Sequence, residues 1–400
     1  MLPENIPVYQ YEILDALVKS VFRIEKFQNG TPKQGYIMRY TGRLIAEDTA
    51  DAYDRLARSL KPYNITPLFR MEEDKHAIIL VPGNPVPKKS NPVVNLVLFI
   101  ATLFSVILVG SFFSLREPLP TDPLAAVIVV IRSGLPFAAS MLAILGAHEF
   151  GHYLAGRSHG VHVTLPYFIP MPFSPFGTMG AFINMKEHPK NRRQLLDIGI
   201  AGPLSGLIVA IPVLLLGLSL SAIDTIPHVM PPGSMMEGNS LLYLLSKYVM
   251  FGELLPAPET YGGIHPALYW LRYIITGTPF PYGGVDVQLH PVAFAGWAGI
   301  LITGLNLIPA GQLDGGHMLY VLFGRKTAQR VLPFILVALV GLGFVWSGWW
   351  LWAMIIFFLG RMYAEPLDQI TPLDGRRRGL AILALILFVL TFTPVPLLIL

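Results

Sequence analysis

The segment His148-Glu149-Phe150-Gly151-His152 is the part of this sequence best suited to do chemistry. Residues four apart lie on the same face of a helix, so the two imidazoles can reach one metal ion while Glu149 lies one step round the helix. His-Glu-x-x-His on a helix is a zinc-binding pattern. Because the segment lies inside an apolar run long enough to cross a membrane, it predicts a hydrolytic zinc site where water is scarce.

A third metal ligand must come from elsewhere in the chain, because catalytic zinc normally takes three protein ligands and leaves a fourth position for water. Asp314 is the best candidate, since it is expected near the end of a later apolar run at the same membrane depth as His148. Pro309 and Gly311 interrupt the backbone just before it, which lets the carboxylate turn toward a metal. We therefore expect one Zn²⁺ per chain, bound by His148, His152 and Asp314.

Each of these residues also has an interpretation without chemistry. The His-Glu-x-x-His pattern can be an inert helix face, Asp314 can cap a helix before two glycines, and Asn306 can bond a neighbouring helix. His317 follows Asp314 by three residues, which places it near the site, but it fits an interfacial position equally well. Ionisable groups at membrane depth cost several kcal/mol and usually mark function, which favours the metal site.

The composition indicates a polytopic membrane protein. Of its 400 residues 53% are hydrophobic and 14% charged, against roughly 25% charged in soluble domains. The net charge of +4 is small and the basic residues lie in short clusters, so no nucleic-acid binding is expected. Cysteine is absent, which excludes disulfides, thiolate ligands and a cysteine nucleophile. The polar first ninety residues do not resemble a signal peptide, so targeting is expected to rest on the first span.

Residues 1–90 are predicted to form a small soluble α/β domain. Apolar residues recur at helical spacing in 11–27 and alternate as in a strand in 36–45. A second amphipathic helix is expected at 48–60, followed by two strands, 65–71 and 76–81, and a linker rich in proline and lysine.

Residues 91–400 are predicted to form an all-α polytopic membrane bundle of about six to eight transmembrane helices. The expected spans are 93–113, 134–156, 195–219, 291–323, 330–346, 349–363 and 379–399. Residues 124–131 are interpreted as a short interfacial or re-entrant piece, because Arg132 and Pro136 interrupt the apolar run. In 201–206, Gly202, Ser205 and Gly206 are expected to allow close helix packing.

Basic residues orient this bundle. Lys88 and Lys89 precede the first span, and three more clusters follow along the chain: Lys186, Lys190, Arg192 and Arg193; Arg325, Lys326 and Arg330; and Arg376, Arg377 and Arg378. With the amino terminus inside, all four clusters fall on the cytoplasmic side, and 220–290 becomes an extracytoplasmic segment whose short apolar pieces lie on the membrane. We expect an integral protein of the bacterial cytoplasmic membrane, with a cytoplasmic amino-terminal domain.

The two motifs together resemble the site-2 protease family of intramembrane zinc metalloproteases. His-Glu-x-x-His on one span and Asn-x-x-Pro-x-x-x-x-Asp-Gly on a later one carry the resemblance, which continues through 177–182 and 201–206 and covers roughly 134–324 as a catalytic core. The motif in 306–317 is similar to the bacterial and chloroplast branch that lacks a PDZ domain. No insert large enough for a PDZ domain and no CBS pair is found in the sequence.

The resemblance implies a role for each matching residue. His148, His152 and Asp314 would be zinc ligands, Glu149 the general base, and Asn306 a catalytic residue that hydrogen-bonds the substrate or oxyanion. The resemblance also suggests that the loop after the second span pairs with an unwound substrate by strand addition. The expected substrate-binding residues are Gly177, Thr178, Met179, Gly180 and Asn184. Gly206 stands where many relatives carry asparagine, so any polar role at that position is lost.

The function predicted from these features is intramembrane proteolysis of membrane proteins, with the lipid bilayer as the other partner. A zinc or proton-coupled transporter is an alternative, because intramembrane His and Asp also suit transport, although the sequence shows no internal repeat. A catalytically inactive membrane scaffold is the second alternative, and the intact Glu149 argues against it. The sequence leaves the oligomeric state and the role of the amino-terminal domain open.

Overall fold

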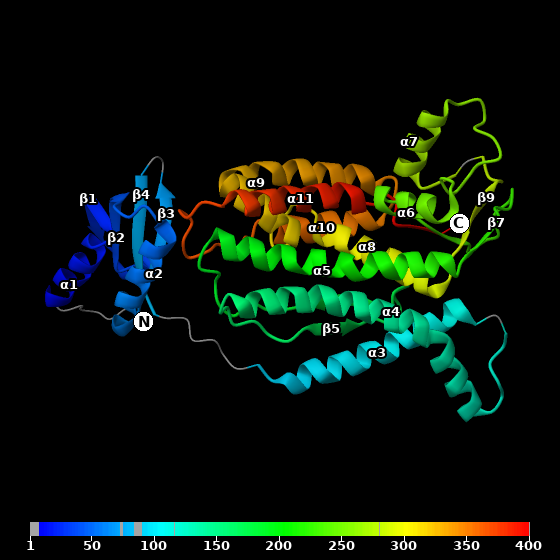
Figure 1. Cartoon of the computed structure of the whole chain (residues 1–400), viewed down its shortest axis with the longest axis horizontal. Helices are drawn as coiled ribbons and strands as arrows, with labels where there is room; N and C mark the ends of the chain where they lie inside the picture. Colours follow the sequence, from blue (N-terminus) through cyan, green and yellow to red (C-terminus); the bar gives the residue numbers. More distant parts are fainter. Residues whose placement is uncertain (1–7, 73–74, 84–89, 116, 280, 400) are drawn as a thin grey trace.

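The computed structural model describes residues 8–72, 75–83, 90–115, 117–279 and 281–399. Lys88 and Lys89, the first basic cluster, lie outside these residues. Figure 1 shows a small amino-terminal domain at one end of a long helical bundle and a loop-rich segment at the other end.

The amino-terminal domain is a four-stranded antiparallel sheet of order β1-β2-β4-β3, packed against two helices. Its elements are α1 (Val8–Lys19), β1 (Phe22–Asn29), β2 (Met38–Leu44), α2 (Thr49–Leu60), β3 (Ile65–Glu72) and β4 (Lys75–Pro82). Asp48 caps α2 by accepting hydrogen bonds from the backbone of Ala50 and Asp51. Tyr40, Phe69 and Ile78 lie in the core between the sheet and the helices. The predicted α/β character of this domain is confirmed.

One prediction in this domain is wrong. The helix expected over 11–27 ends at Lys19, and 22–29 form β1 instead. Phe22 is buried and pairs opposite Leu44 of β2, and the pairing continues to Asn29 with a shift of register between Ile24 and Lys26. The aromatic and branched side chains at this point therefore favour a strand once a neighbouring strand is present to pair with it.

The edge strand β3 attaches the domain to the bundle. The N–H of Phe69 donates to the carbonyl oxygen of Leu367 at 2.9 Å, and the N–H of Gln369 donates back to Phe69 at 3.0 Å. On its other side, the N–H of Asp368 donates to the carbonyl of Lys190 at 2.7 Å. Residues 367–369 thus lie between β3 and the chain that leads into the long helix α5 (Arg192–Ser219).

Seven of the described helices make up the bundle, and α5 runs through its middle between α4 and α8 (Figure 1). Besides α5 they are α3 (Pro92–Ser114), α4 (Pro123–Ser158), α8 (Pro291–Asn306), α9 (Asp314–Gly343), α10 (Gly348–Leu359) and α11 (Gly375–Thr391). Four of the described helices, α3, α4, α5 and α9, are long and apolar enough to cross a membrane. The predicted helical membrane architecture is confirmed, while the expected number of spans stays a prediction.

The first half of the bundle agrees with the prediction at two of its three helices. The first and third spans, 93–113 and 195–219, agree with α3 and α5. The expected interruption of the chain between 124–131 and the second span is wrong, because α4 is continuous from Pro123 to Ser158, while an interfacial position of 124–131 stays a prediction. Asp122 caps its start, and Pro136 is accommodated inside the helix.

The later spans are divided differently from the prediction. The expected span 291–323 is broken after Asn306, and a second helix, α9, begins at Asp314. That helix bends at Gly324, where the backbone has φ 78°, and continues through most of the expected fifth span to Gly343. The last helix ends at Thr391, so 397–399 form a strand rather than the end of a span.

The segment 220–290 covers the end of the bundle opposite the amino-terminal domain (Figure 1). It contains β7 (Ala222–Thr225), β8 (Met235–Glu237), α6 (Leu241–Phe251), α7 (Pro266–Thr276) and β9 (Val285–Gln288), and β8 pairs with β10 (Leu397–Ile399). Lys247 is fully buried with its Nζ 3.4 Å from Asp286. Burial, helped by the nearby Asp286 carboxylate, raises the pKa of Glu237 in the same cluster.

Candidate metal centre

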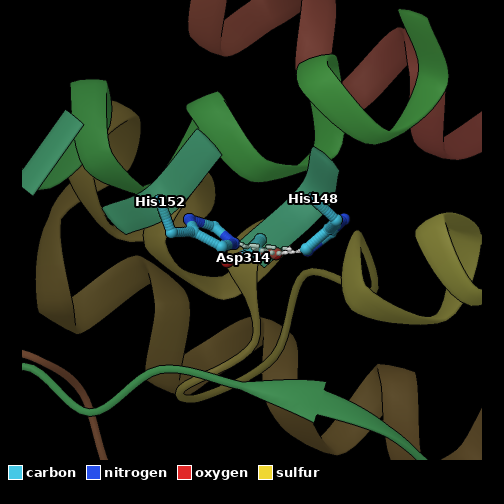
Figure 2. A group of neighbouring side chains, drawn as sticks. All are labelled: His148, His152 and Asp314. Carbon is cyan, nitrogen blue, oxygen red and sulfur yellow. Dashed lines mark hydrogen bonds and ion pairs between the residues drawn. The ribbon is translucent and has the colours of Figure 1, made fainter. Parts of the chain in front are cut away.

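Three side chains from two helices converge on one point. The Nε2 atoms of His148 and His152 on α4 lie 3.2 Å apart. Each of them lies 3.4 Å from Oδ2 of Asp314, the first residue of α9 (Figure 2). The predicted meeting of the paired histidines with Asp314 is therefore present, across more than 160 residues of intervening sequence.

The separations of these atoms suit zinc. Zinc binds imidazole nitrogen and carboxylate oxygen at about 2.0–2.2 Å with tetrahedral geometry, which places ligand atoms roughly 3.3 Å apart. The Nδ1 of His152 lies 2.7 Å from the carbonyl oxygen of Ile198 and therefore carries the hydrogen. In the neutral imidazole, Nε2 then presents its lone pair toward the carboxylate of Asp314. These three side chains form a group that could hold a metal ion.

The metal centre opens on a cavity of about 450 Å³. Glu149 is buried, lines this cavity and lies within hydrogen-bonding reach of the backbone N–H of Ile183. The Nδ2 of Asn306 lies 3.3 Å from Nε2 of His148, at the carboxyl end of α8. The two residues expected to be catalytic are thus beside the metal ligands.

His317 also lines the cavity. It is buried, and within the described residues its Nδ1 has no hydrogen-bond partner. The helical spacing from Asp314 correctly places His317 near the site. His317 is not one of the three grouped ligands.

Helix α5 shapes the pocket that holds the two imidazoles. A Cβ atom on Gly202 would lie 2.1 Å from Nε2 of His152, and one on Gly206 would lie 3.1 Å from Nδ1 of His148. Because a helical carbonyl points toward the residue four positions later, the bare backbone at Gly202 also exposes the Ile198 carbonyl to His152. The predicted close packing is confirmed, and the side chains that pack against the two glycines are the candidate metal ligands His152 and His148.

Sequence reasoning missed this target, although a signal was available. The two glycines are spaced by four residues, as are the two histidines. Equal spacing lets one helix offer each imidazole a notch, meaning the space left where a glycine has no side chain. The absence of a side chain at Gly206, noted as a departure from many relatives, leaves the ring of His148 room beside α5.

The residues expected to bind substrate are divided between two places. Asn184 lines the cavity. Gly177, Thr178, Met179 and Gly180 lie in or next to the hairpin of β5 (Tyr167–Pro170) and β6 (Thr178–Phe182), outside the lining of the cavity. The carbonyl of Gly177 accepts a hydrogen bond from Ser105 of α3 at 2.5 Å. The next residues of the hairpin, 181–183, do line the cavity.

The missing side chain at Gly202 should matter for zinc affinity. Gly202→Ala adds a methyl group where the ring of His152 lies, so we expect a roughly tenfold or greater loss of zinc affinity, as for other disturbances around metal ligands. Gly146→Ala on α4 is the matched control, because nothing lies within 4 Å of its added Cβ. Competition against a chelator measures both affinities, and equal affinities in the two variants would contradict the described packing.

Comparisons with known proteins find relatives that are named as zinc metalloproteases. The probable zinc metalloprotease EGY2, chloroplastic, of Arabidopsis thaliana is 30% identical over 397 residues, which cover 96% of this chain and 65% of the relative. The probable zinc metalloprotease EGY1, chloroplastic, of Oryza sativa subsp. japonica is 30% identical over 320 residues, covering 76% of this chain and 50% of the relative. The probable zinc metallopeptidase EGY3, chloroplastic, of Arabidopsis thaliana is 30% identical over 306 residues, covering 75% and 48%.

The chain spans less than two thirds of the length of these relatives. No solved structure matches it. The sequence model of Peptidase family M50 matches residues 136–346, a region that contains all three candidate ligands, Glu149 and Asn306. This match and the chloroplastic relatives confirm the resemblance seen in the sequence, and the chain belongs to peptidase family M50, the site-2 protease family.

Proposed function

We propose that this chain is an intramembrane zinc endopeptidase that hydrolyses peptide bonds in or near the transmembrane segments of membrane proteins. It would hold one Zn²⁺ through His148, His152 and Asp314. The observation that carries the proposal is the convergence of these three ligand atoms, 3.2 to 3.4 Å apart, on a cavity that Glu149 also lines.

The chemistry follows from the positions of the side chains. A zinc ion bound here would acidify water and polarise a peptide carbonyl. Glu149 takes the proton of the attacking water and returns it to the leaving amine. Asn306, with its Nδ2 3.3 Å from His148, is placed to donate a hydrogen bond to the carbonyl oxygen as negative charge develops on it.

The β5–β6 hairpin supports a mode of substrate binding. A transmembrane helix must unwind before its peptide bonds are accessible, and the extended segment then needs partners for its backbone. Within the described residues the hairpin has two strands, so β6 has an edge on which a substrate strand can add. We propose that Gly177, Thr178, Met179 and Gly180 offer the outer part of this edge and Asn184 the part inside the cavity.

The arrangement also supports a topology. We propose that α8, α10 and α11 join the four long helices in a bundle of six to eight membrane-crossing elements, with 134–324 as the catalytic core and 220–290 outside. The three basic clusters within the described residues lie at the same end as the amino-terminal domain, as the pairing of Lys190 with Asp54 illustrates. The positive-inside bias favours the cytoplasmic side for this end. The relatives are named as chloroplastic, so a bacterial cytoplasmic membrane stays a prediction.

Two variants test the proposed enzyme. Asp314→Ala removes one of three ligands, so purified protein should lose both its zinc and cleavage of a model membrane substrate. Glu149→Gln leaves the ligands in place, so it should keep one zinc per chain while kcat falls by a factor of about 10² to 10⁴. Metal analysis and a cleavage assay in detergent or liposomes measure both effects.

Two outcomes of these assays would contradict the proposal. Cleavage by Glu149→Gln at the rate of the unaltered protein would exclude Glu149 as the general base and with it the proposed mechanism. Zinc flux into liposomes without any cleavage would instead support a transporter.

The proposed substrate edge is tested with a pair of prolines. Successive N–H groups of a strand point to opposite edges, so Ala181→Pro and Phe182→Pro remove one donor that faces β5 and one that faces the free edge. We expect the variant that loses the outward donor to lose cleavage with its zinc content intact. If both variants cleave normally, the substrate does not bind by adding to β6.

A further inference from the structure

The basic run at the start of α11 contains one arginine that does not behave like its neighbours. Arg376 and Arg378 are exposed, as expected of topology determinants. Arg377 is half-buried and grips the carboxylate of Asp197 on α5, with Nε 2.9 and 3.1 Å from its two oxygens and Nη2 2.6 Å from Oδ2. Its Nη1 binds Asp374, the residue that caps α11, at 2.5 Å.

The same carboxylate also binds the end of α4. The Nε2 of His159 lies 3.0 Å from Oδ2 of Asp197, and His159 is the residue that caps the carboxyl end of α4. Asp197 therefore joins three helices, α4, α5 and α11, at the end of the bundle that carries the amino-terminal domain. Two-pronged arginine–carboxylate pairs fix direction as well as distance, which a single contact between flexible chains does not.

The junction at Asp197 lies one residue before Ile198, which hydrogen-bonds the candidate metal ligand His152. Asp197 directly precedes Ile198, whose carbonyl oxygen accepts the hydrogen bond from Nδ1 of His152 at 2.7 Å. The hydrogen bond made by the second nitrogen of a metal-bound histidine fixes its tautomer and the orientation of its ring. A shift of α5 by the rise of a single residue, about 1.5 Å, would break that bond and push Gly202 away from the imidazole.

We infer that Asp197, held by Arg377, is a positioning residue that fixes α5 against α4 and so orients His152 for the metal. The inference rests on the zinc site of the proposed function. Arg377, the arginine at the centre of the basic run, would then help to orient a metal ligand, in addition to any effect of its charge on topology.

Cobalt binding by the purified full chain tests this inference, because Co²⁺ takes the same ligands as zinc and its visible absorption depends on their geometry. Asp197→Asn keeps the size of the side chain but removes the charge that Arg377 grips. We expect roughly tenfold weaker cobalt affinity and an altered visible spectrum, with the unfolding temperature measured alongside. Arg377→Gln should have a similar effect, and the double variant should lose less than the sum of the two single losses, because both single variants remove the pair between Arg377 and Asp197.

Arg376→Gln is the matched control. It removes the same charge from the same run, so any consequence of a weaker topology signal appears in it as well as in Arg377→Gln. We expect Arg376→Gln to bind cobalt with the affinity and spectrum of the unaltered chain, and equal losses in these two variants would overturn the inference.

The remaining outcomes are also decisive. Unaltered affinity and spectrum in both Asp197→Asn and Arg377→Gln would refute the positioning role while leaving the proposed function intact. If the unaltered chain binds neither cobalt nor zinc, both the positioning role and the proposed function are refuted. Should Asp197→Asn fail to fold, Arg377→Lys decides, since it keeps the charge and loses the two-pronged geometry, and the expected and contrary results are the same.

Discussion

The structure depends on one constraint: two histidines and a carboxylate from helices far apart in the chain must bring their lone pairs to within 3.4 Å of one another at membrane depth. Such a set repels itself unless a cation lies between its members. The surrounding protein must therefore hold the side chains in place before the metal binds. The path of α5, the break before α9 and the cavity beside Glu149 bring these side chains together.

The break between α8 and α9 is the second consequence of the constraint. A continuous helix through 291–323 would have placed Asp314 inside a span, with the direction of its side chain set by the helix alone. Ending α8 at Asn306 and starting α9 at Asp314 places both side chains at helix ends, beside the cavity. Irregular backbone at this depth is tolerated because it lines a cavity and not the lipid.

Sequence reasoning reached the ligands because their chemistry has a fixed spacing. His148 and His152 follow from helical periodicity, and Asp314 from the need for a third ligand at equal depth, a residue that the family resemblance also indicates. Pro309 and Gly311 indicated an interruption before Asp314, but the end of α8 at Asn306 was missed. The strand at Phe22 was missed because an apolar run looks the same whether it forms a helix or pairs with a distant segment. The contact between Arg377 and Asp197 was out of reach, since the neighbouring arginines carry the same local pattern and only tertiary packing separates them.

The central claim is that a single divalent cation joins α4 and α9 through two imidazoles and one carboxylate. X-ray absorption at the zinc edge of the purified, zinc-loaded chain tests it most directly. The account predicts nitrogen and oxygen neighbours at about 2.0–2.2 Å with outer-shell scattering from two imidazole rings. A spectrum that requires one imidazole or none, or three or more, would contradict it.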